Sequence, residues 1–209
     1  MADAATLNRS AAVASISVAV FLIALKSWAA WLTGSTAMLG SLADTMLDFV
    51  ASLATLIGVW IAGQPADEQH RFGHGKAEAI AAMFQVVLIS ISALAIAARA
   101  IDQFVAGGRT EAAAEGIGVS LVAMAATFFL LLWQRHVIAR TGSIAIATDH
   151  VHYQSDLLLN LAVITALGLD QYMGLTGVDP LFGLAIAAWL GWGAWKASHR
   201  AIEQLMDRE

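Results

Sequence analysis

The sequence has no cysteine among its 209 residues, and only 13% of its residues are charged. The absence of cysteine excludes disulfide bonds and thiolate ligands, so any bound metal must be held by nitrogen and oxygen donors. No basic run suggests a nucleic-acid partner. Hydrophobic residues make up 59% of the chain and the mean hydropathy is +0.71, far from the composition of a soluble domain. The sequence therefore predicts an integral membrane protein, with the lipid bilayer as its partner, and not an enzyme.

Six apolar segments each reach the roughly 20 residues that a helix needs to cross the hydrocarbon core. They lie near residues 11–33, 37–63, 77–105, 115–138, 143–169 and 179–200. We therefore predict an all-α fold, a six-helix transmembrane bundle that forms a single domain over residues 1–209. Most lysine and arginine residues fall on one side of this bundle, so we expect both termini to be cytoplasmic.

Two pairs of ionisable residues interrupt the second and fifth segments. Asp44 and Asp48 are four residues apart, as are His152 and Asp156, so each pair shares one face of its helix near the middle of the segment. An Asp at that depth costs about 2.5–3.5 kcal/mol unless it is compensated. If the two helices face one another, three carboxylates and one imidazole can surround Zn²⁺. Fe²⁺, Cd²⁺, Co²⁺ and Mn²⁺ are alternative cations for such a site.

The same four residues allow two other interpretations. They can form hydrogen bonds that hold the helices together, although Ser, Thr or Asn would do this at a lower cost. They can also form a proton relay that binds no metal.

Lys26 and Asp149 are two further ionisable residues within apolar segments. Lys26 is expected to extend towards the membrane surface or to pair with an acidic group, and a role in transport is the alternative. Asp149 shares the helix face of His152, either as a step on the approach to the site or as an ordinary polar residue at a helix start.

A second group of potential metal ligands lies in the connection between the second and third segments. Asp67, His70 and His74 are spaced by three and four residues, which places them on one side of a helix or turn. We expect this loop on the cytoplasmic side, where it can capture metal. A solvated loop with two unconnected histidines is the alternative.

Residues 41–48, 67–78 and 152–156 carry three separate motifs. Their order and the number of spans between them resemble the cation diffusion facilitator family, in particular its bacterial zinc/iron-type exporters. The resemblance implies that Asp44, Asp48, His152 and Asp156 form the transport site and that the loop binds Zn²⁺. It also implies a homodimer in the inner (cytoplasmic) membrane of a bacterium, and proton-coupled efflux of divalent metal. Lys76 and Asp207 resemble a family ion pair between the third and sixth segments.

His152 is the candidate proton carrier because an imidazole titrates near neutral pH and must be deprotonated to bind a metal. A fourth carboxylate in its place would favour Mn²⁺ over Zn²⁺. In the resembling family, too, a His at this position is more typical of the zinc- and cadmium-selective branch than of the manganese branch.

Together these features predict an antiporter that exports Zn²⁺, with Cd²⁺, Fe²⁺ or Co²⁺ as other substrates, by alternating access and without an organic cofactor. A non-transporting metal sensor or binding protein and a metal channel are the alternatives. Members of the family usually continue into a cytoplasmic metal-binding domain, whereas this sequence ends at Glu209. We therefore expect that domain to be absent and the homodimer to depend on membrane contacts alone.

Overall fold

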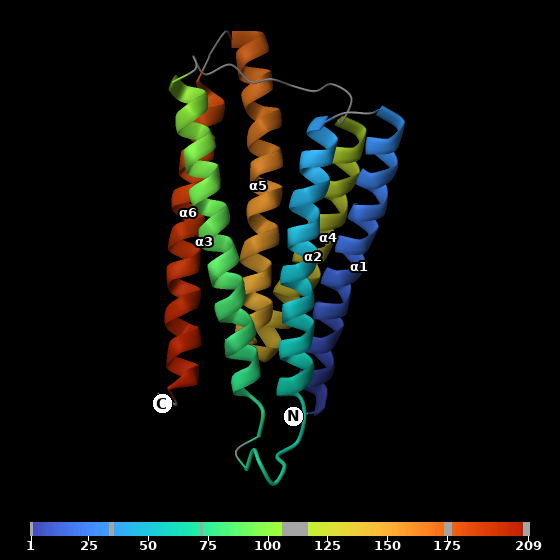
Figure 1. Cartoon of the computed structure of the whole chain (residues 1–209), viewed down its shortest axis with the longest axis vertical. Helices are drawn as coiled ribbons and strands as arrows, with labels where there is room; N and C mark the ends of the chain where they lie inside the picture. The colour runs from blue at the N-terminus through green and yellow to red at the C-terminus, as the bar shows by residue number, and fades with distance from the viewer. Residues whose placement is uncertain (1, 34–35, 72, 106–116, 174–176, 207–209) are drawn as a thin grey trace.

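The part of the chain that the structure describes folds into six long helices. The computed structural model describes residues 2–33, 36–71, 73–105, 117–173 and 177–206. The helices are α1 (Ala2–Thr33), α2 (Thr36–Ala62), α3 (Lys76–Val105), α4 (Ile117–Thr141), α5 (Ile144–Met173) and α6 (Val178–Leu205). They run along one common axis as a bundle (Figure 1). The predicted all-α, six-helix fold is confirmed.

Several helices extend beyond the apolar segments that predicted them. Helix α1 begins at Ala2, whereas the sequence predicted a start near residue 11. Helices α5 and α6 continue to Met173 and Leu205, past the expected ends near residues 169 and 200. Hydropathy marks only the part of a helix that matches the hydrocarbon core, whereas most polar residues do not interrupt the helical backbone. The helices therefore continue past the ends of the apolar segments.

Four of the six helices are long and apolar enough to cross a membrane: α1, α2, α3 and α4. Helices α5 and α6 have 30 and 28 residues, but no window within their described residues reaches the same hydropathy. In α5 the reason is the polar group from Asp149 to Asp156. Because α5 lies among the other helices in Figure 1, these polar side chains can face protein, as membrane burial requires.

The outer surface of the bundle is apolar. Leu94, Phe129 and Trp192 are 72%, 68% and 68% exposed. The interior is packed mainly by small residues, and several alanines are fully or almost fully buried: Ala11, Ala12, Ala79, Ala82, Ala145 and Ala201. This distribution is the reverse of that in a soluble domain and is expected for helices that associate in lipid through close packing.

Helix α2 approaches α3 especially closely at Gly58. A Cβ atom added to Gly58 would lie 2.4 Å from the Cβ atom of Ala81, so no larger residue fits without displacing a helix. This close approach lies between the middle of α2 and the loop that joins it to α3.

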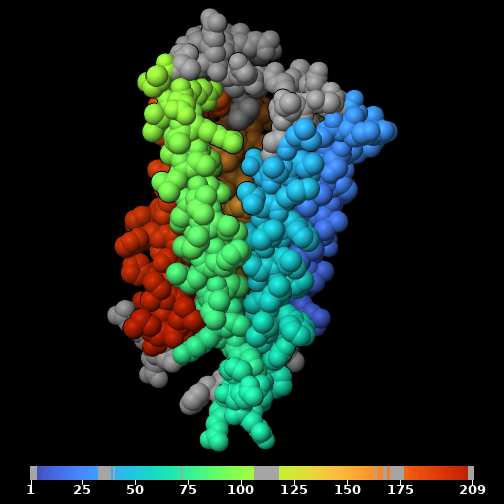
Figure 2. Space-filling model, in the orientation of Figure 1, coloured from blue at the N-terminus to red at the C-terminus, as the bar shows by residue number. Residues whose placement is uncertain are grey.

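Helix α5 occupies the centre of the bundle and contacts the other five helices. In Figure 2 it is visible between α3 and α2 on the near face. The two termini and the loop between α2 and α3 lie at the same end of the bundle (Figure 1), which we call the loop end. This arrangement is expected for an even number of helices that traverse the bundle in alternating directions.

Candidate metal centres

Helices α2 and α5 bring three potential ligands together near the middle of the bundle. The Nε2 atom of His152 lies 2.8 Å from Oδ1 of Asp48. Asp156 completes the group, and one ligand atom from each of the three residues lies within 4.8 Å of the others. We call Asp48, His152 and Asp156 the mid-bundle cluster. Only 9% of the His152 side chain and 17% of the Asp48 side chain are exposed.

Asp44 lies beside the mid-bundle cluster but is not part of it. Its side chain is exposed, and it lines the same two cavities as Asp48 and Asp156. A residue four positions earlier is displaced by about 6 Å along the helix axis, so the Asp44 carboxylate lies to one side of the other three groups. The sequence placed four residues around one ion, whereas the structure groups three and leaves the fourth in the cavity wall.

Two cavities adjoin the cluster, with volumes of about 260 and 220 Å³. Lys26 and Thr45 line the first, and His152 and Arg99 line the second. Since one liquid water occupies about 30 Å³, either cavity can hold a cation with several waters. The carboxylates therefore face space inside the bundle that can hold water, which reduces the cost of placing them at membrane depth.

Both cavities extend from the cluster towards the end of the bundle opposite the loop end. The first includes Lys26 and Ser41, which lie near the last residue of α1 and the first residue of α2. The second extends along α3 to Arg99, six residues from the end of that helix. The cluster is thus approached from one end of the bundle.

On the loop-end side of the cluster, Asp149 forms a fully buried hydrogen-bond network. Its Oδ2 atom accepts hydrogen bonds from Ser15 Oγ and Gln134 Nε2, each at 2.7 Å. Its Oδ1 atom accepts one from Gln85 Nε2 at 2.9 Å and a longer one from Ser52 Oγ at 3.4 Å. These four donors come from α1, α4, α3 and α2, so the five residues, which we call the Asp149 network, connect five helices.

Sequence reasoning left the role of Asp149 open and did not identify its partners. A signal was present: Ser52, Gln85 and Gln134 are polar residues in largely apolar helices. Each lies between seven and ten residues from the helix end nearest the loop end, at a depth similar to that of Asp149. Comparing polar residues by depth across all helices would have grouped them.

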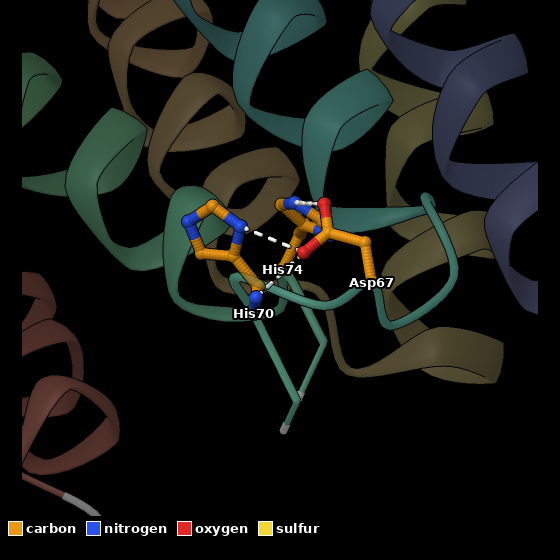
Figure 3. Close-up of side chains that lie close together, drawn as sticks. All are labelled: Asp67, His70 and His74. Atoms are coloured by element: carbon orange, nitrogen blue, oxygen red, sulfur yellow. Dashed lines mark hydrogen bonds and ion pairs between the residues drawn. The ribbon is translucent and has the colours of Figure 1, made fainter.

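The loop between α2 and α3 brings Asp67, His70 and His74 together (Figure 3). His70 Nδ1 lies 3.2 Å from Asp67 Oδ1, and His74 Nε2 lies 3.4 Å from Asp67 Oδ2. The centres of the two imidazole rings are 4.4 Å apart. We call these residues the loop cluster. The geometry shows that the two histidines are connected through one carboxylate, as a turn-like spacing of three and four predicts.

Backbone hydrogen bonds fix the carboxylate of the loop cluster. Asp67 Oδ1 accepts hydrogen bonds from the backbone N–H groups of His70 and Gln69, at 2.5 and 2.9 Å. The bond from the His70 backbone is the main reason why the pKa of Asp67 lies below its usual value. Asp67 is therefore ionised at neutral pH, in the form that binds a cation.

The predicted ion pair between Lys76 and Asp207 falls partly outside the described residues. Lys76 is the first residue of α3, and Asp207 lies beyond the part of the chain that the structure describes. This pair stays a prediction.

Comparison with known proteins adds evidence independent of this geometry. A family model described as the cation efflux transmembrane domain matches residues 12–206. The cation-efflux pump FieF of Cronobacter sakazakii is 41% identical over 206 residues, which cover 99% of this chain and 68% of that protein. The pump of the same name from Klebsiella pneumoniae is 41% identical over 198 residues, covering 95% and 66%. The chain thus spans about two thirds of the length of these relatives.

Proposed function

The chain belongs to the cation efflux family, the cation diffusion facilitators that its motifs resemble, and on this premise we propose that it exports divalent metal cations in exchange for protons. Zn²⁺ is the proposed main substrate, with Cd²⁺, Fe²⁺ and Co²⁺ as further substrates. The observation that most directly supports this proposal is the mid-bundle cluster, in which ligand atoms of one imidazole and two carboxylates lie within 4.8 Å of one another. Nitrogen and oxygen donors in this number suit Zn²⁺, with water or Asp44 as a fourth ligand.

Proton coupling follows from the chemistry of the same ligands. His152 must be neutral to bind a metal, and its Nε2 atom, which faces Asp48 at 2.8 Å, is the atom available for that bond. When the metal leaves, this nitrogen and the neighbouring carboxylates can take up protons. Metal and protons therefore compete for one set of atoms, and proton entry drives metal exit. The proton stoichiometry belongs to the group as a whole and not to one residue.

Alternating access is supported by the unequal surroundings of the cluster. Cavities lead from it towards the end opposite the loop end, whereas the fully buried Asp149 network lies on the loop-end side. With both termini in the cytoplasm, as we propose, this conformation faces outwards. Release of metal occurs from this state, and loading requires a second conformation in which the Asp149 side opens.

The loop cluster has an accessory role in this proposal. It lies at the loop end, where metal enters if that end is cytoplasmic, and its exposed carboxylate is ionised at neutral pH. We propose that it captures Zn²⁺ or orders the loop. We further propose that the chain acts as a homodimer in the bacterial inner membrane.

Uptake of Zn²⁺ into proteoliposomes with an imposed pH gradient tests the function. We expect Zn²⁺ and protons to move in opposite directions in the native chain, and both fluxes to fall at least tenfold in Asp48→Ala. Asp102→Ala is the matched control, since Asp102 is an exposed acid near the end of α3, and it should keep the native fluxes.

Two results would contradict the antiporter. Zn²⁺ binding without flux in any gradient would favour a sensor. Flux that neither saturates nor depends on the pH gradient would favour a channel.

A further inference from the structure

Lys26 places a positive charge in the wall of the first cavity. Its Nζ atom donates hydrogen bonds to Thr45 Oγ1 at 2.6 Å and to the backbone oxygen of Ser41 at 3.3 Å. Both acceptors belong to α2, and Thr45 directly follows Asp44 in sequence. The ammonium is therefore held against the helix that carries two of the acidic residues and does not extend to the membrane surface.

The two acidic residues of the mid-bundle cluster and the neighbouring Asp44 line the same cavity. Asp44, Asp48 and Asp156 line it together with Lys26. With the carboxylates in their metal-binding form, the first cavity carries three negative charges and one positive charge, which leaves two negative charges; Arg99 lies in the wall of the second cavity, which the same carboxylates line. One divalent cation neutralises this remainder, whereas without Lys26 the cavity would carry three negative charges.

From this charge balance we propose that Lys26 determines the affinity and charge selectivity of the metal site. Its ammonium matches the cavity to a single divalent cation and keeps binding weak enough for release. A unit charge that shares a cavity with a divalent cation changes its affinity by about tenfold or more, even at an effective dielectric constant near 20. The inference rests on the proposed transport function, because it assigns a role at the same site.

A purely structural role would make a different prediction. If Lys26 only connected α1 to α2, its contribution would come mainly from the shorter of its two hydrogen bonds, the one to Thr45, and Thr45→Val would have nearly the same effect as Lys26→Gln. If the charge matters, Lys26→Arg should bind Zn²⁺ about as tightly as the native chain. Thr45→Val should change the affinity less than Lys26→Gln does.

The experiment is Zn²⁺ titration by calorimetry of the purified chain in detergent, with Asp67→Ala and His70→Ala present so that the loop cluster does not bind. We expect Lys26→Gln to lower the Kd for Zn²⁺ about tenfold or more. Because release then becomes slower, the maximal Zn²⁺ flux in proteoliposomes should fall. Lys26→Arg should stay within about threefold of the native Kd, and Thr45→Val, which keeps the charge, should change the Kd less than Lys26→Gln does. Lys196→Gln, which removes an exposed lysine of α6, is the matched control and should change nothing.

An added charge tests the inference in the opposite direction and does not require Lys26 to be replaced. Asn160 lines the same cavity, so Asn160→Lys should weaken Zn²⁺ binding about tenfold. Unchanged binding in both Lys26→Gln and Asn160→Lys would overturn the proposal. Equal effects of Lys26→Gln and Thr45→Val would assign the structural role instead. Failure of the native chain to bind Zn²⁺, or equal binding by Asp48→Ala, would refute the proposed site itself.

Discussion

Replacement of Asp149 by alanine should destabilise the bundle more than any other single loss of a carboxylate. Asp149 is fully buried, and its two oxygens accept four hydrogen bonds from four other helices. Alanine removes all four acceptor contacts at once and leaves the donors inside the bundle, where no lipid or bulk water replaces them.

The size of the effect depends on which donors have a second acceptor. Ser15 Oγ lies 3.1 Å from the backbone oxygen of Ala11, and Ser52 Oγ lies 2.8 Å from Tyr153 Oη, so both hydroxyls can be redirected. Gln134 loses the acceptor of one N–H group and keeps Ser15 Oγ for the other. Gln85 keeps Thr55 Oγ1 for one N–H group and has only the longer contact of 3.4 Å to the backbone oxygen of Ala51 for the other. An unsatisfied buried donor costs about 1–3 kcal/mol, so two cost about 2–6 kcal/mol. Interhelical hydrogen bonds in membrane proteins average about 0.6 kcal/mol, or about 2.4 kcal/mol for four. We therefore expect a loss of about 2–4 kcal/mol.

Equilibrium unfolding in mixed micelles, followed by the fluorescence of the seven tryptophans, measures this loss. Ser52→Ala is the matched control within the network because, of the four bonds to Asp149, it removes only the 3.4 Å one. It also removes the 2.8 Å contact to Tyr153 Oη, which can still donate to the backbone oxygen of Ser15, so it should cost less than about 1 kcal/mol. Asp102→Ala controls for the loss of an exposed acid and should have no effect. If Asp149→Ala were as stable as Ser52→Ala, the network would not hold the helices together, and the energetic reasoning above would be wrong.

Two further predictions concern the two clusters. His152→Asp should raise the ratio of Mn²⁺ to Zn²⁺ flux in proteoliposomes and flatten its pH dependence near neutrality, because it makes the site harder and removes the imidazole; an unchanged metal ratio and pH profile would contradict the assignment of His152. Asp67→Asn should reduce Zn²⁺ binding by one site in equilibrium dialysis while the mid-bundle site remains, and Glu68→Gln, an exposed neighbour, should not. Because the pKa of Asp67 is lowered from 3.8, its contribution to loop order is complete above pH 3.8 and is lost only as the pH falls through the lower folded value. A carboxyl titration by NMR should therefore give a midpoint below 3.8, and a midpoint above that value would refute the hydrogen-bonded turn.

The apolar pattern predicted the six helices because a membrane restricts the chain to a few simple solutions. Long apolar runs must be helical to satisfy their backbone groups in lipid. The spacing of four between His152 and Asp156 likewise placed both residues on one face, and the cost of a charge in lipid required that face to point inwards. Helical periodicity and burial energy were therefore sufficient for these features.

Contacts between helices could not be predicted in the same way. The spacing of Asp44 and Asp48 indicates a shared face, but the rotation of α2 against α5 decides which of the two lies closer to His152. The partner of Lys26 and the donors around Asp149 likewise depend on which helices are neighbours. Periodicity in a single sequence defines a face and a depth but not the residue that meets it across the interface.

The hydrogen-bond partners of the buried carboxylates distinguish a structural role from a binding role. Asp149 has four donors and no exposure, so its oxygens have little capacity left for a cation. Asp48 accepts a hydrogen bond only from His152 among the residues that the structure describes, and Asp156 accepts none there through its carboxylate. Both face cavities large enough for a hydrated ion. Since a buried carboxylate without donors is costly, we propose that a metal ion or protons interact with the carboxylates of the mid-bundle cluster.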